Sequence, residues 1–154
     1  MSILTNESLE KFLKENDRPI IFTNGCFDIL HIGHLRYLEA SKAINPDGVL
    51  VVGLNSDSSV KTLKGESRPI NPEAERAELL NALKPVDHVV IFSETTAENI
   101  LRKIQADYYT KGGDYDLSDL GKCPEFKVAD EISCKIKLIN FEEGYSSSRL
   151  IAKL

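Results

Sequence analysis

The chain has 154 residues, of which 42% are apolar, so one domain can form a hydrophobic core without disulfides or metal ions. The formal net charge of -5 at pH 7 disfavours a nucleic acid or an anionic membrane as a partner. Three cysteines without a CxxC pair predict reduced thiols and a cytoplasmic setting.

No segment reads as a targeting signal or a membrane span. Residues 1–16 are polar and helical in pattern, so we expect no signal peptide there. The longest apolar run, Val49–Leu54, is too short to cross a bilayer. We therefore expect no membrane partner.

Short β-rich runs alternate with amphipathic stretches along the chain. Leu9, Phe12 and Leu13 form the apolar stripe of a first helix. The expected strands are Pro19–Thr23, Val49–Asn55, His88–Phe92, Asp107–Thr110 and Lys135–Asn140. Further helices are expected over about Gly33–Ile44, over residues 97–104 with Ala97, Ile100, Leu101 and Ile104 on one face, and over Ser146–Leu154.

One more helix is expected after a loop at residues 64–72. Asn71 is in position to cap it, with Pro72 as its first residue and Glu73 in its first turn. The whole pattern predicts a single Rossmann-like α/β domain over residues 1–154, with a five-stranded parallel sheet and helices on both faces. Ligands of such folds bind beyond the carboxyl ends of the strands, so the loops after the strands are the candidate site.

The loop after the first expected strand carries the strongest chemical signal. It reads NGCFDILHIGH from Asn24 to His34 and holds two of the three histidines in the chain. Gly25 allows a tight turn, and Gly33 stands where a helix begins and a phosphate can approach the helix N-terminus. His31 and His34 are three residues apart, so both can face one ligand. A zinc site is disfavoured because no third ligand is evident.

The segment GCFDILHIGH resembles the signature of the HxGH cytidylyltransferase-like superfamily. Further blocks follow in order, namely NSD at 55–57, LKGESRP at 63–69, KGGD at 111–114 and GYSSS at 144–148. The series is similar to the D-glycero-β-D-manno-heptose 1-phosphate adenylyltransferase family over about residues 18–154. The resemblance implies a nucleotidyltransferase that joins AMP from ATP to a sugar 1-phosphate and releases pyrophosphate.

The residue chemistry and the resemblance together assign roles in the expected site. Catalytic roles are expected for His31, His34 and Lys64. Nucleotide and phosphate contacts are expected from Asn24, Gly25, Cys26, Phe27, Gly33, Lys61, Arg76, Lys111, Gly112, Asp114, Ser146, Ser147 and Ser148. Acceptor contacts are expected from Asp28, Asn55, Asp57 and Arg68.

Several of these residues also fit structural roles. Lys61, Lys64 and Arg68 can close over a triphosphate, or form a solvated basic loop. Arg76 matches a phosphate-contacting arginine of the resembled family, or pairs with a glutamate such as Glu73. The glycines after Lys111 can simply end a strand, and the three serines can simply cap a helix. Cys26 stands where relatives have threonine, so we expect only its backbone to take part.

The expected reaction is a direct displacement. The acceptor phosphate is mostly dianionic at neutral pH because its second pKa is about 6, so no general base is needed. The difficulty is to bring two anions together in line, which requires positive charge and fixed geometry. Histidines, lysines, helix N-termini and Mg²⁺ suit that task. We expect the Mg²⁺ to be carried by the nucleotide, with no metal ligands on the chain.

The expected partners are ATP and a sugar 1-phosphate. The resemblance also implies a homodimer, and a stand-alone transferase whose sugar-phosphate kinase is encoded separately. A glycerol 3-phosphate cytidylyltransferase remains possible but is disfavoured, because Glu142 stands where those enzymes have an arginine. A flavin adenylyltransferase and a catalytically silent nucleotide-binding module also remain open. A class I aminoacyl-tRNA synthetase is disfavoured by the short, acidic chain.

Overall fold

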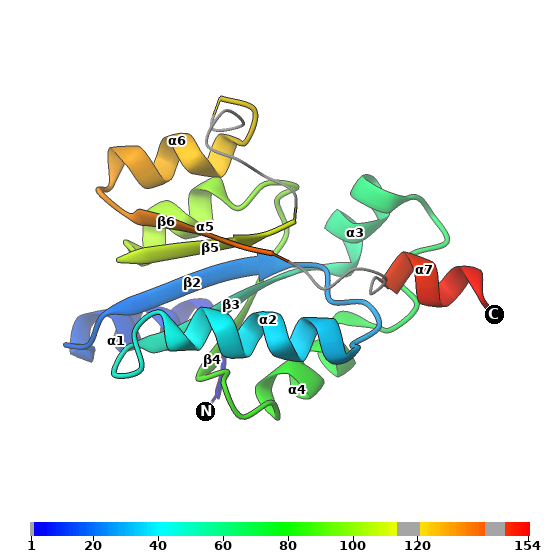
Figure 1. Ribbon diagram of the computed structural model, residues 1–154, viewed down its shortest axis with the longest axis horizontal. Coiled ribbons are helices and arrows are strands. Elements are labelled where there is room, and N and C mark those ends of the chain that lie inside the picture. The colour runs from blue at the N-terminus through cyan, green and yellow to red at the C-terminus, as the bar shows by residue number, and fades with distance from the viewer. Residues whose placement is uncertain (1, 114–120, 141–146) are drawn as a thin grey trace.

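A parallel sheet forms the centre of the molecule (Figure 1). The computed structural model describes residues 2–113, 121–140 and 147–154. The strands are β1 (Ser2–Leu4), β2 (Ile20–Gly25), β3 (Val49–Asn55), β4 (His88–Phe92), β5 (Tyr108–Gly112) and β6 (Lys135–Ile139). Their order across the sheet is β1-β4-β3-β2-β5-β6. The five predicted strands are confirmed, but the predicted strand count is wrong because β1 adds a sixth beside β4.

Helices cover both faces of the sheet, as predicted. They are α1 (Asn6–Glu15), α2 (Ile32–Ala43), α3 (Asp57–Lys64), α4 (Glu73–Asn81), α5 (Glu98–Ile104), α6 (Pro124–Glu131) and α7 (Ser147–Ala152). Leu9 of α1, Leu101 of α5 and Phe126 of α6 share one buried core with the sheet. Leu38 of α2 and Leu80 of α4 share the core on the other face. Within the described residues, no helix has the length and apolar character that crossing a membrane requires.

The strand order reverses at β2, and open α/β sheets bind ligands beyond the carboxyl ends of the strands at such a reversal. β2 pairs with β3 on one side and with β5 on the other, both in parallel register. The chain runs from β2 through α2 to β3, whereas β5 and β6 extend the sheet in the opposite direction. The hydroxyl of Tyr109 in β5 donates to Oδ1 of Asn24 in β2 at 2.6 Å and so bridges the reversal point.

Two local predictions near the carboxyl end of β2 are wrong. Asn24 and Gly25 are the last residues of β2 and not a turn. Asn71 does not cap α4: Pro72 precedes the helix, and the amide of Asn71 donates to the carbonyl oxygen of Asp28 at 2.9 Å. The helix α3 was not predicted either, although Ser56 caps it by accepting from the N–H of Ser59 at 3.2 Å.

Candidate active site

The two histidines of the HxGH segment lie against each other at the start of α2. His31 directly precedes the helix and His34 lies in its first turn. Their rings stack with centroids 3.8 Å apart and 24° between the planes. Nδ1 of His34 accepts from the backbone N–H of His31 at 3.4 Å. In a neutral His34 ring this leaves Nε2 as the nitrogen that carries the proton.

Both imidazoles are held in the neutral form. Burial, together with the smaller effects of the nearby His31 and of the Lys64 charge, lowers the pKa of His34 to about 4. Burial also lowers the pKa of His31. At neutral pH the ligand-free site therefore presents two uncharged imidazoles, and the positive charge comes from the neighbouring lysine.

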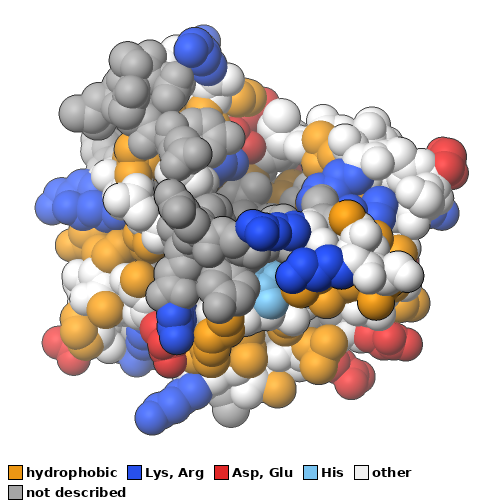
Figure 2. Space-filling view, turned by 45° about the vertical axis from the view of Figure 1, so that its right-hand side comes forward, with side chains coloured by type: hydrophobic (Ala, Val, Ile, Leu, Met, Phe, Trp, Pro, Cys, Tyr) orange, Lys and Arg blue, Asp and Glu red, His pale blue; other side chains and the backbone are white. Residues whose placement is uncertain are grey.

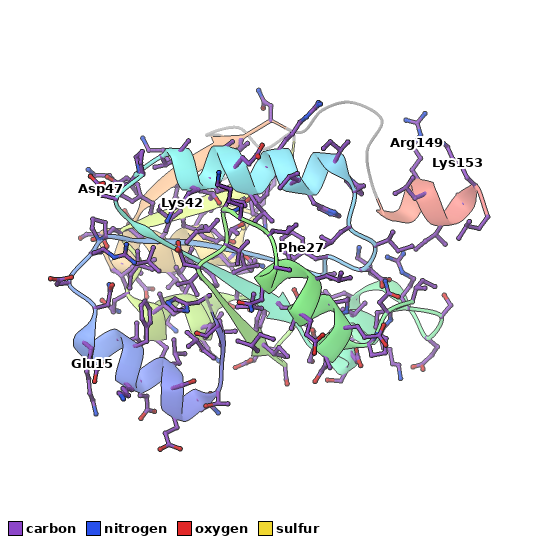
Figure 3. All side chains as sticks on the ribbon, turned by 90° about the horizontal axis from the view of Figure 1, so that it is seen from below. Glu15, Phe27, Lys42, Asp47, Arg149 and Lys153 are labelled. Carbon is purple, nitrogen blue, oxygen red and sulfur yellow. The ribbon has the colours of Figure 1, made fainter. Side chains whose placement is uncertain are left out.

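Gly25 and Phe27 explain how the loop reaches this position. A Cβ atom at Gly25 would lie 2.9 Å from Cε2 of Phe27, so only glycine lets the ring pack there. Phe27 has a φ of 45° and is buried in the core shared by α2 and α4 (Figure 3). Its ring also contacts that of His34, with centroids 5.2 Å apart. The close packing of Gly25 and Phe27 therefore sets the course of the loop that leads to the histidines.

The basic residues of α3 lie on the same side of the molecule. Lys61 and Lys64 occupy the last turn of α3 and are exposed. Lys64 is near enough to lower the pKa of both His34 and Cys26, although burial is the largest influence on each and raises the pKa of the Cys26 thiol. Figure 2 shows Lys and Arg side chains gathered beside a surface histidine. The structure thus brings the three predicted catalytic residues together.

Two predicted acceptor residues bind each other. Asp28 and Arg68 are both buried, and Nε of Arg68 donates to Oδ2 of Asp28 at 2.7 Å. The backbone N–H groups of Ile70 and Asn71 donate to the same carboxylate at 2.9 and 3.0 Å. Burial alone would raise the pKa of Asp28, but these hydrogen bonds and the guanidinium hold it below its usual value. Asp28 therefore fastens residues 68–71 to the loop that precedes α2.

Arg76 lies in the interior, with an exposed fraction of 0%. Its guanidinium donates to the carbonyl oxygens of Cys26 at 2.7 Å, of Asn55 at 2.9 Å and of Asn71 at 2.9 Å. Nη2 also pairs with Oδ1 of Asp57 at 2.7 Å. The alternative pairing with Glu73 is wrong, and a phosphate contact by Arg76 stays a prediction.

The other two acceptor candidates lie beside Arg76 at the end of β3. Asn55 is buried and its amide donates to Oγ of Ser59 at 3.1 Å. The backbone N–H of Asp57 donates to Oε2 of Glu73 at 2.6 Å, while the Asp57 side chain keeps an exposed fraction of 37%. Of these two, Asp57 is the one whose side chain can still reach a ligand.

The remaining nucleotide candidates are only partly described. Lys111 and Gly112 end β5, and Gly113 follows with a φ of 107°. Asp114, Ser146 and the side chains of Ser147 and Ser148 lie outside the described residues. Gly33 is buried in the first turn of α2. Figures 1 and 3 both place α7 beyond the sheet at the end where α2 begins.

A cluster of buried hydroxyls between α2 and the sheet was not predicted from the sequence. The Tyr37 hydroxyl lies 2.7 Å from Oγ1 of Thr23 and 3.1 Å from Oγ1 of Thr110. Oγ of Ser41 lies 3.0 Å from Oγ1 of Thr110. The cluster joins α2 to β2 and β5. The available signal was the spacing of Tyr37 and Ser41, which places both on one face of α2 below His34.

Glu125 was also missed. It is a buried carboxylate in the first turn of α6. Oε1 accepts from the N–H of Ala97 at 2.9 Å, and Oε2 accepts from the Cys123 thiol at 3.1 Å. Burial would raise the pKa of Glu125, but these hydrogen bonds and the nearby Lys111 lower it. The residue therefore supports the segments that follow β4 and β5.

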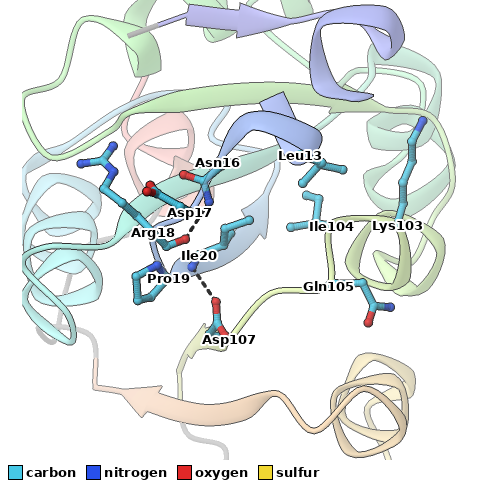
Figure 4. A pocket seen from close by; sticks show the side chains of 10 residues that line it. All are labelled: Leu13, Asn16, Asp17, Arg18, Pro19, Ile20, Lys103, Ile104, Gln105 and Asp107. Atoms are coloured by element: carbon cyan, nitrogen blue, oxygen red, sulfur yellow. Dashed lines mark hydrogen bonds between the residues drawn. The ribbon is translucent and has the colours of Figure 1, made fainter. Parts of the chain in front are cut away.

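A cavity lies at the other end of the strands from the histidines. It lies where β2 and β5 begin and is lined by residues such as Leu13, Arg18 and Gln105 (Figure 4). There Asp107 accepts from the backbone N–H of Ile20 at 2.8 Å. Among the described residues, no three His, Cys, Asp or Glu side chains are grouped to hold a metal ion.

Comparison with known proteins agrees with this architecture. The cytidylyltransferase-like family model matches residues 22–153. "Bifunctional protein HldE" of Campylobacter jejuni strain 81116 is 48% identical over 99% of this chain and 31% of its own length. The protein of the same name from Helicobacter pylori strain J99 is 45% identical over the same shares. The chain therefore spans about a third of the length of these curated relatives.

Solved structures show the same fold. The lipopolysaccharide core biosynthesis protein of Thermoplasma volcanium is similar with a TM-score of 0.62 and 27% identity, covering 84% of this chain and 99% of that one. Pantoate-beta-alanine ligase from Francisella tularensis has a TM-score of 0.63 at 12% identity, covering 100% and 73%. The second likeness concerns the fold alone.

Proposed function

This chain belongs to the cytidylyltransferase-like family, and we propose that it is an adenylyltransferase that forms ADP-heptose from ATP and D-glycero-β-D-manno-heptose 1-phosphate. The observation that carries the proposal is the stacked pair of His31 and His34 beside Lys64, at the carboxyl end of β2 where the strand order reverses. The choice of acceptor is supported by the ordered motif series and by the 48% identity to an HldE protein.

The proposed reaction is an in-line displacement at the α-phosphorus of ATP. An oxygen of the acceptor phosphate forms the new bond to phosphorus, and the bond to the β-phosphate oxygen breaks with its electron pair leaving on pyrophosphate. His31 and His34 donate N–H groups to the α-phosphate oxygens, whose charge grows as the acceptor attacks. Lys61 and Lys64 attract the β- and γ-phosphates: both are in the last turn of α3, and Lys64 is near enough to lower the pKa of His34.

The acceptor is proposed to bind near Asp57, whose side chain is partly exposed at the start of α3. Its carboxylate can accept hydrogen bonds from sugar hydroxyls. Asn55, Asp28 and Arg68 are buried and support the same region from the interior. Arg76, which pairs with Asp57, also binds the carbonyl oxygens of Asn55 and Asn71. The N–H of Asn71 in turn donates to Asp28. Asn24, the glycines and Lys111 line the nucleotide side, where β2 and β5 end.

The proposal includes a metal ion, a cellular compartment, an oligomeric state and a source of the acceptor. Mg²⁺ is carried to the site by ATP and supplies charge neutralisation to the phosphates. The enzyme acts in the cytoplasm, which suits its three free thiols, all in the described part of the chain. It acts as a homodimer, and a sugar-phosphate kinase supplies its acceptor.

A matrix of nucleotides and acceptors tests the proposal. ATP and CTP are each incubated with heptose 1-phosphate, glycerol 3-phosphate and FMN, with pyrophosphate release measured and products identified by mass spectrometry. ADP-heptose is the expected product. Preference for CTP with glycerol 3-phosphate, or for FMN, would replace the substrates but keep the family. Absence of pyrophosphate release in every combination would indicate a catalytically silent module.

A further inference from the structure

One buried guanidinium joins the segments that carry the catalytic side chains. The carbonyl oxygens bound by Arg76 belong to Cys26 in the loop after β2, to Asn55 at the end of β3 and to Asn71 before α4. Its fourth partner is Asp57, the first residue of α3. We infer that Arg76 is a positioning residue that sets the distance between the histidine loop and the lysine-bearing helix α3, and that it is not a phosphate ligand.

The geometry of the four contacts supports this inference. Each donor–acceptor distance lies between 2.7 and 2.9 Å, and the side chain is 0% exposed. A planar guanidinium can serve several acceptors at fixed angles, which an ammonium group cannot. A phosphate could reach Arg76 only by displacing Asp57 or one of the three carbonyl oxygens, and a carbonyl group displaced in the interior would be left without a hydrogen bond.

The contacts lead directly to the catalytic groups. Cys26 lies five positions before His31, in the loop whose course ends at α2. Asp57 begins the helix that ends with Lys64. When Arg76 holds both segments, His34 and Lys64 stay near enough for the lysine charge to affect the histidine. The expected effect of Arg76 on the rate of transfer rests on the proposed function, whereas its effect on the position of the loop after β2 does not.

The Cys26 thiol reports on the loop without any substrate. Cys26 is half-buried, whereas Cys123 and Cys134 are each 7% exposed, so alkylation by iodoacetamide distinguishes them once the modified peptides are identified. In Arg76→Lys, the loop loses its fixed contact and alkylation of Cys26 should be several-fold faster in the folded, ligand-free protein. Arg102→Lys is the matched control, because Arg102 forms an exposed pair with Glu131, and its rate should not change.

Kinetics then separate positioning from phosphate binding and from stability alone. With the substrate pair found in the matrix above, Arg76→Lys should lower kcat by about 10²-fold, the effect of a small misplacement of reacting groups. The Kd for ATP should change by less than about threefold, because the phosphate ligands themselves remain. A large rise in that Kd with unchanged Cys26 alkylation would identify Arg76 as a phosphate ligand and overturn the inference.

A lower melting temperature of Arg76→Lys with unchanged kcat would also overturn the inference, because Arg76 would then act on stability alone. If Arg76→Lys does not fold, Asp57→Ala removes one of the four partners, and a smaller acceleration of Cys26 alkylation is expected. An unchanged alkylation rate in a folded Asp57→Ala would contradict the inference. Inactivity of the wild type with every substrate pair would refute the proposed function and leave the alkylation result standing.

Discussion

His31 and His34 stack with their ring centroids only 3.8 Å apart. Two positively charged imidazoles would repel each other at this separation, and burial already disfavours the charge on each. At neutral pH the pair is therefore uncharged in the ligand-free protein, and a triphosphate bound beside it would favour protonation of either ring. A motif that looks cationic in the sequence is thus uncharged in the ligand-free protein.

The free energy of unfolding should depend on His34 in mildly acidic solution. The pKa of His34 is about 4 in the folded protein against a reference value of 6.5, so the folded state binds fewer protons between these values. Stability should therefore fall as the pH drops from about 6.5 to about 4, by up to roughly 3 kcal/mol at about 1.4 kcal/mol per pKa unit. Urea unfolding at a series of pH values measures this, and His34→Gln should flatten the profile. A variant profile parallel to the wild type would contradict the assignment.

Breaking the buried pair of Asp28 and Arg68 should cost more than breaking an exposed one. Asp28→Asn leaves the Arg68 charge buried without its counter-charge, which should destabilise the protein by about 3 kcal/mol. In the exposed control, Glu131→Gln beside Arg102, we expect less than about 1 kcal/mol. Urea unfolding of each variant at pH 7 measures both changes in the free energy of unfolding.

A double-mutant cycle shows whether the effect belongs to the pair. Asp28→Asn combined with Arg68→Met should be less destabilising than the two single effects added together, because neither charge is then left alone. Additive effects would mean that Asp28 acts mainly through the N–H groups of Ile70 and Asn71.

A methyl group at Gly25 should disturb the loop by contact with Phe27. The added Cβ would lie 2.9 Å from the Phe27 ring, which is itself buried and cannot easily move. Gly25→Ala should lower kcat/KM at least about tenfold, since the displaced loop carries the histidines. Gly121→Ala is the matched control, because a Cβ there meets nothing within 4 Å. Gly25→Ala combined with Phe27→Leu should recover part of the loss, and no recovery would point to a different cause.

The fold followed from the sequence where burial fixes the pattern. All seven residues of β3 are buried, and Ala97, Ile100, Leu101 and Ile104 are all in the core as their spacing predicted. The edge strand β1 has three residues and exists through its pairing with β4, from Ser2 opposite His88 to Leu4 opposite Val90. No local pattern of three residues specifies such a pairing.

The sequence predicted the histidine pair of the site, but not the buried ion pairs that hold the surrounding loops. A strand, loop and helix in succession place His31 and His34 together, and residue spacing is enough to see this. Asp28, Arg68 and Arg76 are charged residues near phosphate-binding motifs, so their sequence context suggests ligands. Their burial and mutual partners depend on where residues 65–72 pack in three dimensions, which the sequence pattern alone does not specify.

We expect His31 to donate a hydrogen bond to the α-phosphate in the transition state of the transfer. Charge on the α-phosphate oxygens grows as the acceptor attacks, so a hydrogen bond from His31 should strengthen more in the transition state than in the ground state. His31→Ala should then lower kcat by roughly 10²–10³-fold, as is typical for the loss of one preorganised donor. The KM for ATP should change little, because Lys61 and Lys64 still attract the triphosphate. Steady-state kinetics of a variant with wild-type circular dichroism measure both constants. A raised KM with intact kcat would make His31 a binding residue only, and two unchanged constants would remove it from the catalytic site.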